Sequence, residues 1–242
     1  MLYLSRLMLN VRDRNVRRDL ADVQQLHRTI LRAFPSVPEG VSAREHFGIL
    51  FRAEPVTDQP LVVRVLVQST HTPDWSHLLT GYLAPPADDR PNPAVRQLLD
   101  YDHVVAGMTL RFRLRANPTQ RIGKGNLEQD VKWRGKRVEL RREADQLTWI
   151  GRKAEQGGFR LLSIATRPDL ADVRISPQAK VVGARSKDPI RKPMTFGAVL
   201  FEGLLQVQDR DRFRQTLIAG IGSGKAYGFG LMSIGTSRGG VT

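Results

Sequence analysis

The fold of the second half of the chain is decided by residues 209–234, which read DRDRFRQTLIAGIGSGKAYGFGLMSI. Asp209 to Ile218 has the pattern of a helix, and Leu231 to Ile234 has the pattern of a strand. Between them, five glycines lie within the eleven residues from Gly220 to Gly230. Glycine permits positive φ and lets the backbone approach a neighbour closely, so a tight helix-to-strand turn is predicted here.

This glycine loop carries one lysine, Lys225, and successive backbone N–H groups beside it can form an anion-binding nest. A phosphate is the expected anion, because the formal net charge is +14. A P-loop is excluded, since its first glycine would fall at Ala219 and its lysine is followed here by Ala226. A dinucleotide fingerprint needs a strand before the glycines and a helix after them, which is the reverse order. A turn without any ligand stays open as the alternative.

The charge of the chain is clustered. Its 242 residues include 38 basic and 24 acidic residues, and most of the basic ones are arginine. Residues 111–142 hold 11 basic and 3 acidic residues, and residues 180–192 hold 5 and 1. Arginine's planar fork matches phosphate oxygens two at a time. The clusters therefore favour a nucleic-acid partner over the alternative, a basic surface that is merely solvated.

Several classes of protein are excluded or disfavoured by composition. The chain has no cysteine, so disulfides and cysteine-based metal sites are excluded, and its five histidines lack ligand spacing. We therefore expect neither a metal nor a cofactor. The N-terminus acquires charge too early for a signal peptide, and no apolar run approaches the roughly 20 residues that span a bilayer. These features predict a soluble, cytoplasmic protein with no membrane partner.

The order of predicted elements repeats. The first half reads as strand, helix, strand, strand, and the second as β-α-β-β-α-β with a basic hairpin insert. We therefore predict an α+β fold of two tandem ferredoxin-like (RRM-like) domains. Residues 1–84 form the first, a proline-rich linker spans 85–105, and residues 106–242 form the second. The elements expected are strands at 2–9, 47–52, 61–69, 108–116, 159–164 and 195–207, helices at 15–34, 142–156 and 209–218, and the basic hairpin at 173–192.

One histidine, His27, is a candidate for acid–base chemistry. It lies at the edge of the apolar stripe of the first helix, among Arg17, Arg18 and Arg28. A histidine in a basic field holds its proton less tightly and can act as a general base near neutral pH. RNA carries its own nucleophile, the 2′-OH, so its cleavage requires only proton transfer and stabilisation of a phosphorane. A helix-edge histidine with no role is the alternative.

Motifs along nearly the whole chain resemble those of the CasE family, CRISPR precursor-RNA endoribonucleases that are subunits of the type I-E Cascade complex. Singly each is weak, but together and in order they are specific. The matching segments are Asn10–Leu20, Leu26–Thr29, Phe34–Pro35, Val67–Ser69, Pro73–Ser76, Leu110–Pro118, Gly157–Phe159, Val199–Gly203 and the loop from Gly220 to Leu231.

The resemblance implies a fold of two ferredoxin-like domains and metal-independent cleavage at the base of a CRISPR repeat stem-loop. Attack by the 2′-OH would leave a 2′,3′-cyclic phosphate and a 5′-OH, and the product would be retained for Cascade assembly. The partners implied are the repeat RNA and other Cascade subunits, and we expect a monomer when the protein is free.

The family's catalytic histidine matches His27. Gln24, Arg28 and Lys225 are candidates for auxiliary roles. The expected RNA-binding residues are the basic side chains beside His27, on the 108–116 strand and in the hairpin, together with the glycine loop: Arg17, Arg18, Arg113, Arg115, Lys180, Arg185, Lys187, Arg191, Lys192, Gly222, Gly224 and Lys225.

The chain departs from the family pattern at Gln24, where some members have a tyrosine that partners the histidine in catalysis. Glutamine can form hydrogen bonds but cannot exchange a proton. A Tyr–His pair is therefore not expected here, and His27 would act with basic groups alone. A non-catalytic RNA-hairpin-binding scaffold of the same fold is the alternative function, and a basic α/β domain that binds another polyanion is a third.

Overall fold

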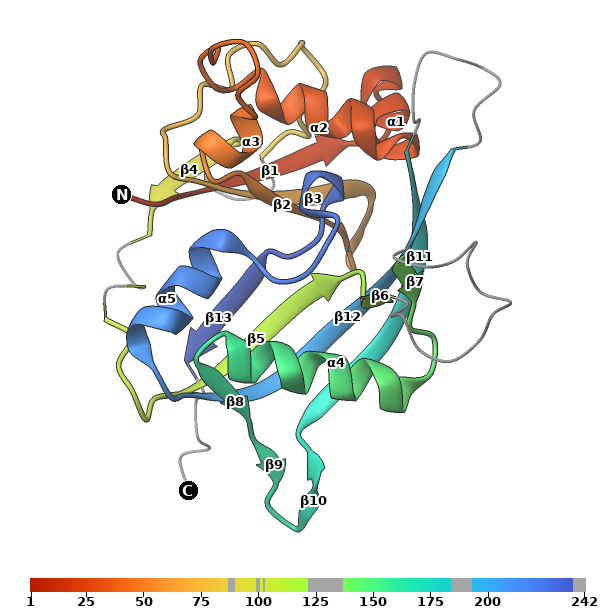
Figure 1. Cartoon of the computed structure of the whole chain (residues 1–242). Coiled ribbons are helices and arrows are strands. Elements are labelled where there is room, and N and C mark those ends of the chain that lie inside the picture. Colours follow the sequence, from red (N-terminus) through yellow and green to blue (C-terminus); the bar gives the residue numbers. More distant parts are fainter. Residues whose placement is uncertain (87–89, 99–100, 102, 122–136, 184–192, 237–242) are drawn as a thin grey trace.

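A computed structural model describes residues 1–86, 90–98, 101, 103–121, 137–183 and 193–236 (Figure 1). Its two larger sheets are antiparallel and each carries helices, one sheet in each half of the chain, and two further sheets, β9-β10 and β6-β7, have two strands each. Four of the predicted RNA-binding residues of the hairpin lie outside the described residues: Arg185, Lys187, Arg191 and Lys192.

The first domain is a four-stranded sheet with the order β2-β3-β1-β4, which is the strand order of a ferredoxin-like unit. Buried apolar side chains of the helices and the sheet form its core, among them Val16, Ile30 and Val67. Its elements are β1 (Tyr3–Asn10), α1 (Arg14–Ala21), α2 (Val23–Leu31), α3 (Ala43–His46), β2 (Leu50–Val56), β3 (Gln59–Ser69) and β4 (Ala94–Gln97).

Two predictions for this domain were wrong in detail. The single helix expected over residues 15–34 is two helices, because Asp22 has extended dihedrals (φ −128°, ψ 102°) and caps α2 through a bond from the Gln24 N–H. Residues 94–97, inside the predicted linker, form β4 and pair with β1. The described residues between β3 and β4, 70–86 and 90–93, contain no helix.

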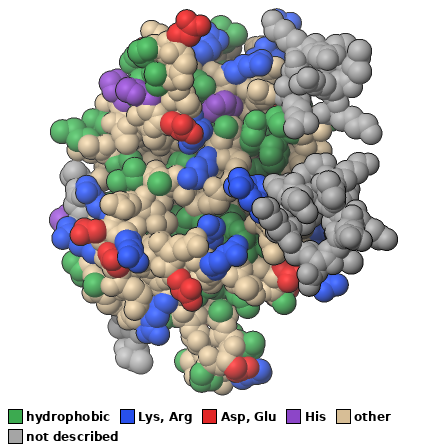
Figure 2. Space-filling view, in the orientation of Figure 1, with side chains coloured by type: hydrophobic (Ala, Val, Ile, Leu, Met, Phe, Trp, Pro, Cys, Tyr) green, Lys and Arg blue, Asp and Glu red, His purple; other side chains and the backbone are tan. Residues whose placement is uncertain are grey.

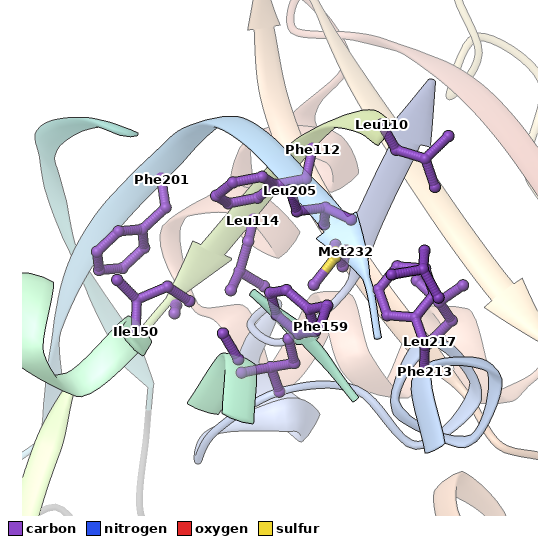
Figure 3. Close-up of a cluster of buried hydrophobic side chains, with 14 of the residues drawn as sticks. Leu110, Phe112, Leu114, Ile150, Phe159, Phe201, Leu205, Phe213, Leu217 and Met232 are labelled. Atoms are coloured by element: carbon purple, nitrogen blue, oxygen red, sulfur yellow. The ribbon is translucent and has the colours of Figure 1, made fainter. Parts of the chain in front are cut away.

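The second domain has the order β11-β12-β5-β13, with β8 also paired to β12. Helices α4 and α5 pack on one face of this sheet, and Figure 3 shows their side chains meeting those of the strands. The two-domain ferredoxin-like prediction is confirmed by this repeated order. Its elements are β5 (Thr109–Ala116), β6 (Thr119–Arg121), β7 (Arg137–Glu139), α4 (Glu143–Gln156), β8 (Phe159–Leu161), β9 (Ser163–Ile164), β10 (Arg167–Ala171), β11 (Val173–Gly183), β12 (Met194–Val207), α5 (Arg210–Ala219), η2 (Lys225–Tyr227) and β13 (Met232–Thr236).

The predicted basic hairpin is built from strands of this sheet. Strand β11 pairs with β12 from Val173 opposite Gly203 to Gly183 opposite Met194. The arms of the hairpin are therefore continuous with the sheet edge. Gly183, at the end of the β11 arm, lies against Val23 at the start of α2.

A buried arginine joins the two sheets. The Arg52 side chain is 2% exposed and donates to the carbonyl oxygens of Arg113 (3.1 Å) and Leu231 (2.9 Å) and to Ser233 Oγ (2.9 Å). Its Nε donates to Glu54 Oε1 at 2.7 Å. Both strands contacted, β5 and β13, belong to the second domain, so Arg52 fixes the first sheet against the second.

Candidate active site between the two domains

The position of His27 is set by the packing of α2. Leu26 and Ile30 are buried in the first-domain core, which leaves His27 half-buried at the edge of the helix. Its ring stacks on Phe51 of β2, with 6.2 Å between ring centroids and an interplanar angle of 19°. The imidazole is therefore held against the sheet while it stays accessible at its rim.

Its surroundings keep His27 uncharged at neutral pH. Burial, then the charges of Arg44 and Arg28, lower the pKa of His27 from 6.5 to about 4. The Nδ1 atom is buried and has no hydrogen-bond partner among the residues that the structure describes. A neutral imidazole is suited to accept a proton, and because Nδ1 is buried, Nε2 is the nitrogen that can meet a substrate.

A buried carboxylate holds the helix that carries His27. Asp19 of α1 is fully buried and accepts hydrogen bonds from Thr29 Oγ1 (2.6 Å) and from the Tyr82 hydroxyl (2.9 Å). Arg18 completes the set with an ion pair of 2.8 Å. Burial and the Asp19 charge raise the pKa of Tyr82, so its hydroxyl remains a donor. These bonds tie α1, α2 and residue 82 together and fix the direction of α2.

The glycine loop brings Lys225 to this helix. All five of its glycines have positive φ, and η2 within the loop packs against α2 and β2. Gly228 (φ +80°) passes so close to the Phe51 ring that a Cβ would lie 3.1 Å from it. The ring on which His27 stacks is therefore also the surface on which the loop rests.

Arg44 is a site residue that the sequence did not indicate. It lies on the four-residue helix α3, and its charge lowers the pKa of both His27 and Lys225. For Lys225 burial is the larger cause, and Glu45 acts in the opposite direction. The side chain of Arg44 is paired with Glu45. The capping serine at Ser42 was the one local signal for α3, and nothing local connects residue 44 to residue 27.

The predicted auxiliary residues lie on α2 and on the glycine loop. Gln24 lies one turn before His27 and is half-buried, and Arg28 is exposed beside it. Lys225 is half-buried on the opposite wall. On the face shown in Figure 2, Lys and Arg side chains gather between α2 above and α4 below. Their assignment to catalysis or RNA binding stays a prediction.

Several of the predicted RNA-binding residues make contacts within the protein. Arg113 pairs with Glu54 (3.0 Å) and Glu202 (3.5 Å), and Arg115 lies over the Phe229 ring at 5.3 Å. Burial, then the nearby Arg52, lower the pKa of Arg115. Arg113 therefore contributes to the contact between sheets, while Arg115 packs on the glycine loop of its own domain. RNA binding by them stays a prediction.

The remaining predicted contacts differ in exposure. Arg17 is exposed on α1 and donates to the carbonyl oxygen of Arg12 at 2.7 Å, and Lys180 is exposed on β11. Gly222 and Gly224 have positive φ and pack against Trp149 and Phe229. Internal packing thus accounts for these two glycines, and their contact with RNA stays a prediction.

Neither a metal centre nor a membrane span is found in the part of the chain that the structure describes. No three His, Asp or Glu side chains there are grouped so that they could bind a metal ion. None of the described helices combines the length and the apolar character needed to cross a bilayer.

The fold and the site together define a tandem ferredoxin-like protein with a basic site between its domains. A family model described as CRISPR associated protein matches residues 2–235. The chain belongs to this family of CRISPR-associated proteins.

Relatives match over almost the entire chain. The CRISPR-associated endoribonuclease Cse3 of Thermus thermophilus is 39% identical over 238 residues, covering 96% of this chain and 99% of the relative. The Cascade subunit CasE of Escherichia coli is 27% identical over 215 residues, with 88% and 92% covered.

Solved structures of related proteins also match this chain over nearly its whole length. Cse3 bound to a 19-nucleotide RNA superimposes with a TM-score of 0.75 at 35% identity, covering 96% of this chain and 98% of the other. Thermus thermophilus Cse3 bound to an RNA representing a pre-cleavage complex gives a TM-score of 0.72 at 36% identity, with 97% and 98% covered. Cas6e from Escherichia coli gives 0.64 at 26% identity, with 97% and 99% covered.

Proposed function

We propose that this protein is an endoribonuclease that processes CRISPR precursor RNA, cutting each repeat at the base of its stem-loop without a metal ion. The observation that carries the proposal is the placement of a neutral His27 in the positive field of Arg44 and Arg28, next to the loop that carries Lys225. The endoribonuclease name of the 39% identical relative supports it.

The chemistry follows from the groups present. A ring nitrogen of His27 takes the proton of the 2′-OH at the cut site, and the 2′-oxygen bonds to phosphorus. The bond from phosphorus to the 5′-oxygen breaks, and that oxygen receives a proton, giving a 2′,3′-cyclic phosphate and a 5′-OH. Arg28, Arg44 and Lys225 stabilise the negative charge of the phosphorane.

The partners proposed are the CRISPR repeat stem-loop and the other subunits of Cascade, which retain the cut product with this protein in the prokaryotic cytoplasm. Solved relatives bound to RNA and in an RNA-guided surveillance complex support this. Lys180 on the β11 arm and the basic residues of the predicted hairpin would lie along the stem.

The decisive experiment uses a repeat RNA in EDTA. Wild-type protein is expected to make one cut, and His27→Ala to lose at least about 100-fold in rate while stem-loop affinity changes by less than about threefold, since general acid–base catalysis typically contributes 10²–10⁴. Circular dichroism of the variant checks its fold. Cutting that requires added Mg²⁺, or a fully active variant, contradicts the proposal.

A 2′-deoxy nucleotide at the cut site separates this proposal from a non-catalytic scaffold. The deoxy RNA should bind as well as the all-ribose RNA but remain uncut. If the all-ribose RNA also binds and is never cut, the protein is a scaffold that keeps the fold and lacks the activity.

A further inference from the structure

A basic cavity in the second domain has Lys225 in its lining. Its volume is about 610 Å³, and it is bounded by α4, the end of α5, the glycine loop and the β6 and β7 strands. Five basic side chains line it, and no acidic side chain does so among the residues that the structure describes: Arg121, Arg137, Arg152, Lys153 and Lys225.

Among the residues that the structure describes, no acidic side chain forms an ion pair with the five basic side chains of this cavity. Burial, then the charges of Arg152 and Arg137, lower the pKa of Lys153. The Lys153 ammonium donates to Gln156 Oε1 at 2.9 Å. Arg121, Arg137 and Arg152 form no ion pair within the described ranges of the chain. Like charges held together without counter-charges indicate a site for an anion.

The glycine loop is the wall between this cavity and His27. Gly222 rests on the indole of Trp149 so closely that a Cβ would lie 3.0 Å from the ring. The charge of Lys225 interacts with those of both Arg44 and Lys153. A continuous track of positive charge therefore runs from His27 across the loop into the cavity.

We propose that this cavity binds the single-stranded RNA that adjoins the scissile phosphate, through the phosphodiester groups of that strand. This inference rests on the proposed function. The volume falls in the range of small-ligand pockets, about 300–1,000 Å³, which suits nucleotides of a single strand and not a duplex. The positive track through Lys225 would let one RNA strand extend from His27 into the cavity. An arginine guanidinium can bind two oxygens of one phosphate at a time.

The experiment compares two non-cleavable RNAs, both 2′-deoxy at the cut site. One is the bare repeat stem-loop and the other carries single-stranded flanks on both sides. The variant Arg121→Ala plus Arg152→Ala removes two exposed cavity side chains. The control variant Arg96→Ala plus Arg167→Ala removes the same charge from two exposed arginines that do not line the cavity.

For wild-type protein, the flanked RNA should bind more tightly than the bare stem-loop. The cavity variant should lose about tenfold or more in affinity for the flanked RNA and less than about twofold for the bare one. Its salt slope on the flanked RNA should fall by about 1.4, since each single-strand phosphate contributes about 0.7. The control variant should lose the same factor in affinity for both RNAs. RNAs trimmed on one side only then identify the flank that is bound.

Two results overturn the inference. The cavity variant could lose the same factor in affinity for both RNAs, or the control variant could lose as much affinity for the flanked RNA as the cavity variant does. These differ from failure of the proposed function. If wild-type protein neither binds nor cuts the stem-loop, the proposed function fails. If wild-type protein binds and cuts it while the cavity variant keeps the full advantage of the flanks, only the cavity assignment fails.

Discussion

At the scale of single residues, the protonation of His27 follows from where its ring lies. Burial against Phe51 and the positive field of Arg44 and Arg28 both disfavour the imidazolium. The neutral form therefore predominates from about pH 5 upward. Arg44 thus affects the proposed base and the proposed phosphate ligand Lys225 in the same direction.

The pH dependence of cleavage tests this directly. Because the pKa of His27 in the free protein is about 4, kcat/KM should change by less than about twofold between pH 5 and 7 if His27 acts as the base. With an unshifted pKa of about 6.5, kcat/KM would fall roughly 25-fold from pH 7 to pH 5, because the neutral, basic form of the histidine declines below pH 6.5. A steep acid limb near 6.5 in wild-type protein contradicts the assignment.

Replacing Arg44 should change the pKa of His27. In Arg44→Ala the pKa of His27 should rise toward 6.5, because a like charge that disfavours the imidazolium has been removed. NMR titration of the His27 ring measures it, and Arg28→Ala, the weaker neighbour, should shift it less. If His27 titrates identically in both variants and in wild-type protein, the charge of Arg44 does not act on it.

At the scale of elements, the glycine loop is a packed structure whose backbone only glycine adopts readily. Its five glycines all lie at positive φ, the loop rests on Phe51 and Trp149, and its own Phe229 packs against Gly224. Tyr227 stacks on Phe196 of β12, with 4.6 Å between centroids. The loop therefore carries Lys225 to α2 in a defined position.

Gly228→Ala should disturb both stability and catalysis. A Cβ at φ +80° costs about 1–2 kcal/mol in unfolding free energy, and contact with Phe51 displaces the ring under His27. Urea unfolding measures the first effect, and a fall in kcat larger than the rise in KM shows the second. Gly235→Ala is the matched control, since that position has open space and ordinary φ. Equal effects of the two substitutions would count against this account.

Elements with strong periodicity were predictable from the sequence, and those set by tertiary contacts were not. The alternation of Leu110, Phe112 and Leu114 appears as the buried face of β5, and Gly157 ends α4 as expected. The break at Asp22 was missed, although an aspartate that can cap a helix was present. Strand β4 exists because β1 offers it an edge, and short segments carry little periodicity of their own.

The residues of the candidate site likewise include some that the sequence could identify and some that it could not. His27 was identified by resemblance, and the track from Arg44 through Lys225 to Lys153 joins residues distant in sequence. Such proximity arises from the fold, and spacing along the chain does not encode it.

At the scale of the whole molecule, the site exists only while the two domains are held together. His27 belongs to one and Lys225 to the other, and the contact between them centres on Arg52 and Glu54. Burial raises the pKa of Glu54, but Arg52, Arg64 and Arg113 outweigh it and lower the pKa overall. Glu54 is thus the negative charge that these three arginines share, and Arg113 also pairs with Glu202.

Glu54→Gln should therefore destabilise the protein by about 3–5 kcal/mol, because it leaves the buried Arg52 charge uncompensated. Glu202→Gln, whose carboxylate is partly exposed and 3.5 Å from Arg113, should cost less than about 1 kcal/mol. Denaturant unfolding of both variants gives the comparison. Equal losses would show that the buried pair does not dominate the contact.

The hydrogen bonds of Arg52 also bear on how this chain can diverge. Two of its three acceptors across the domain contact are the backbone carbonyls of Arg113 and Leu231. A carbonyl is present whatever side chain a mutation installs, so positions 113 and 231 are free to vary without loss of these bonds. For these two bonds the requirement falls on Arg52: a new side chain at position 113 or 231 leaves the acceptor in place, while replacement of Arg52 removes the donor of both.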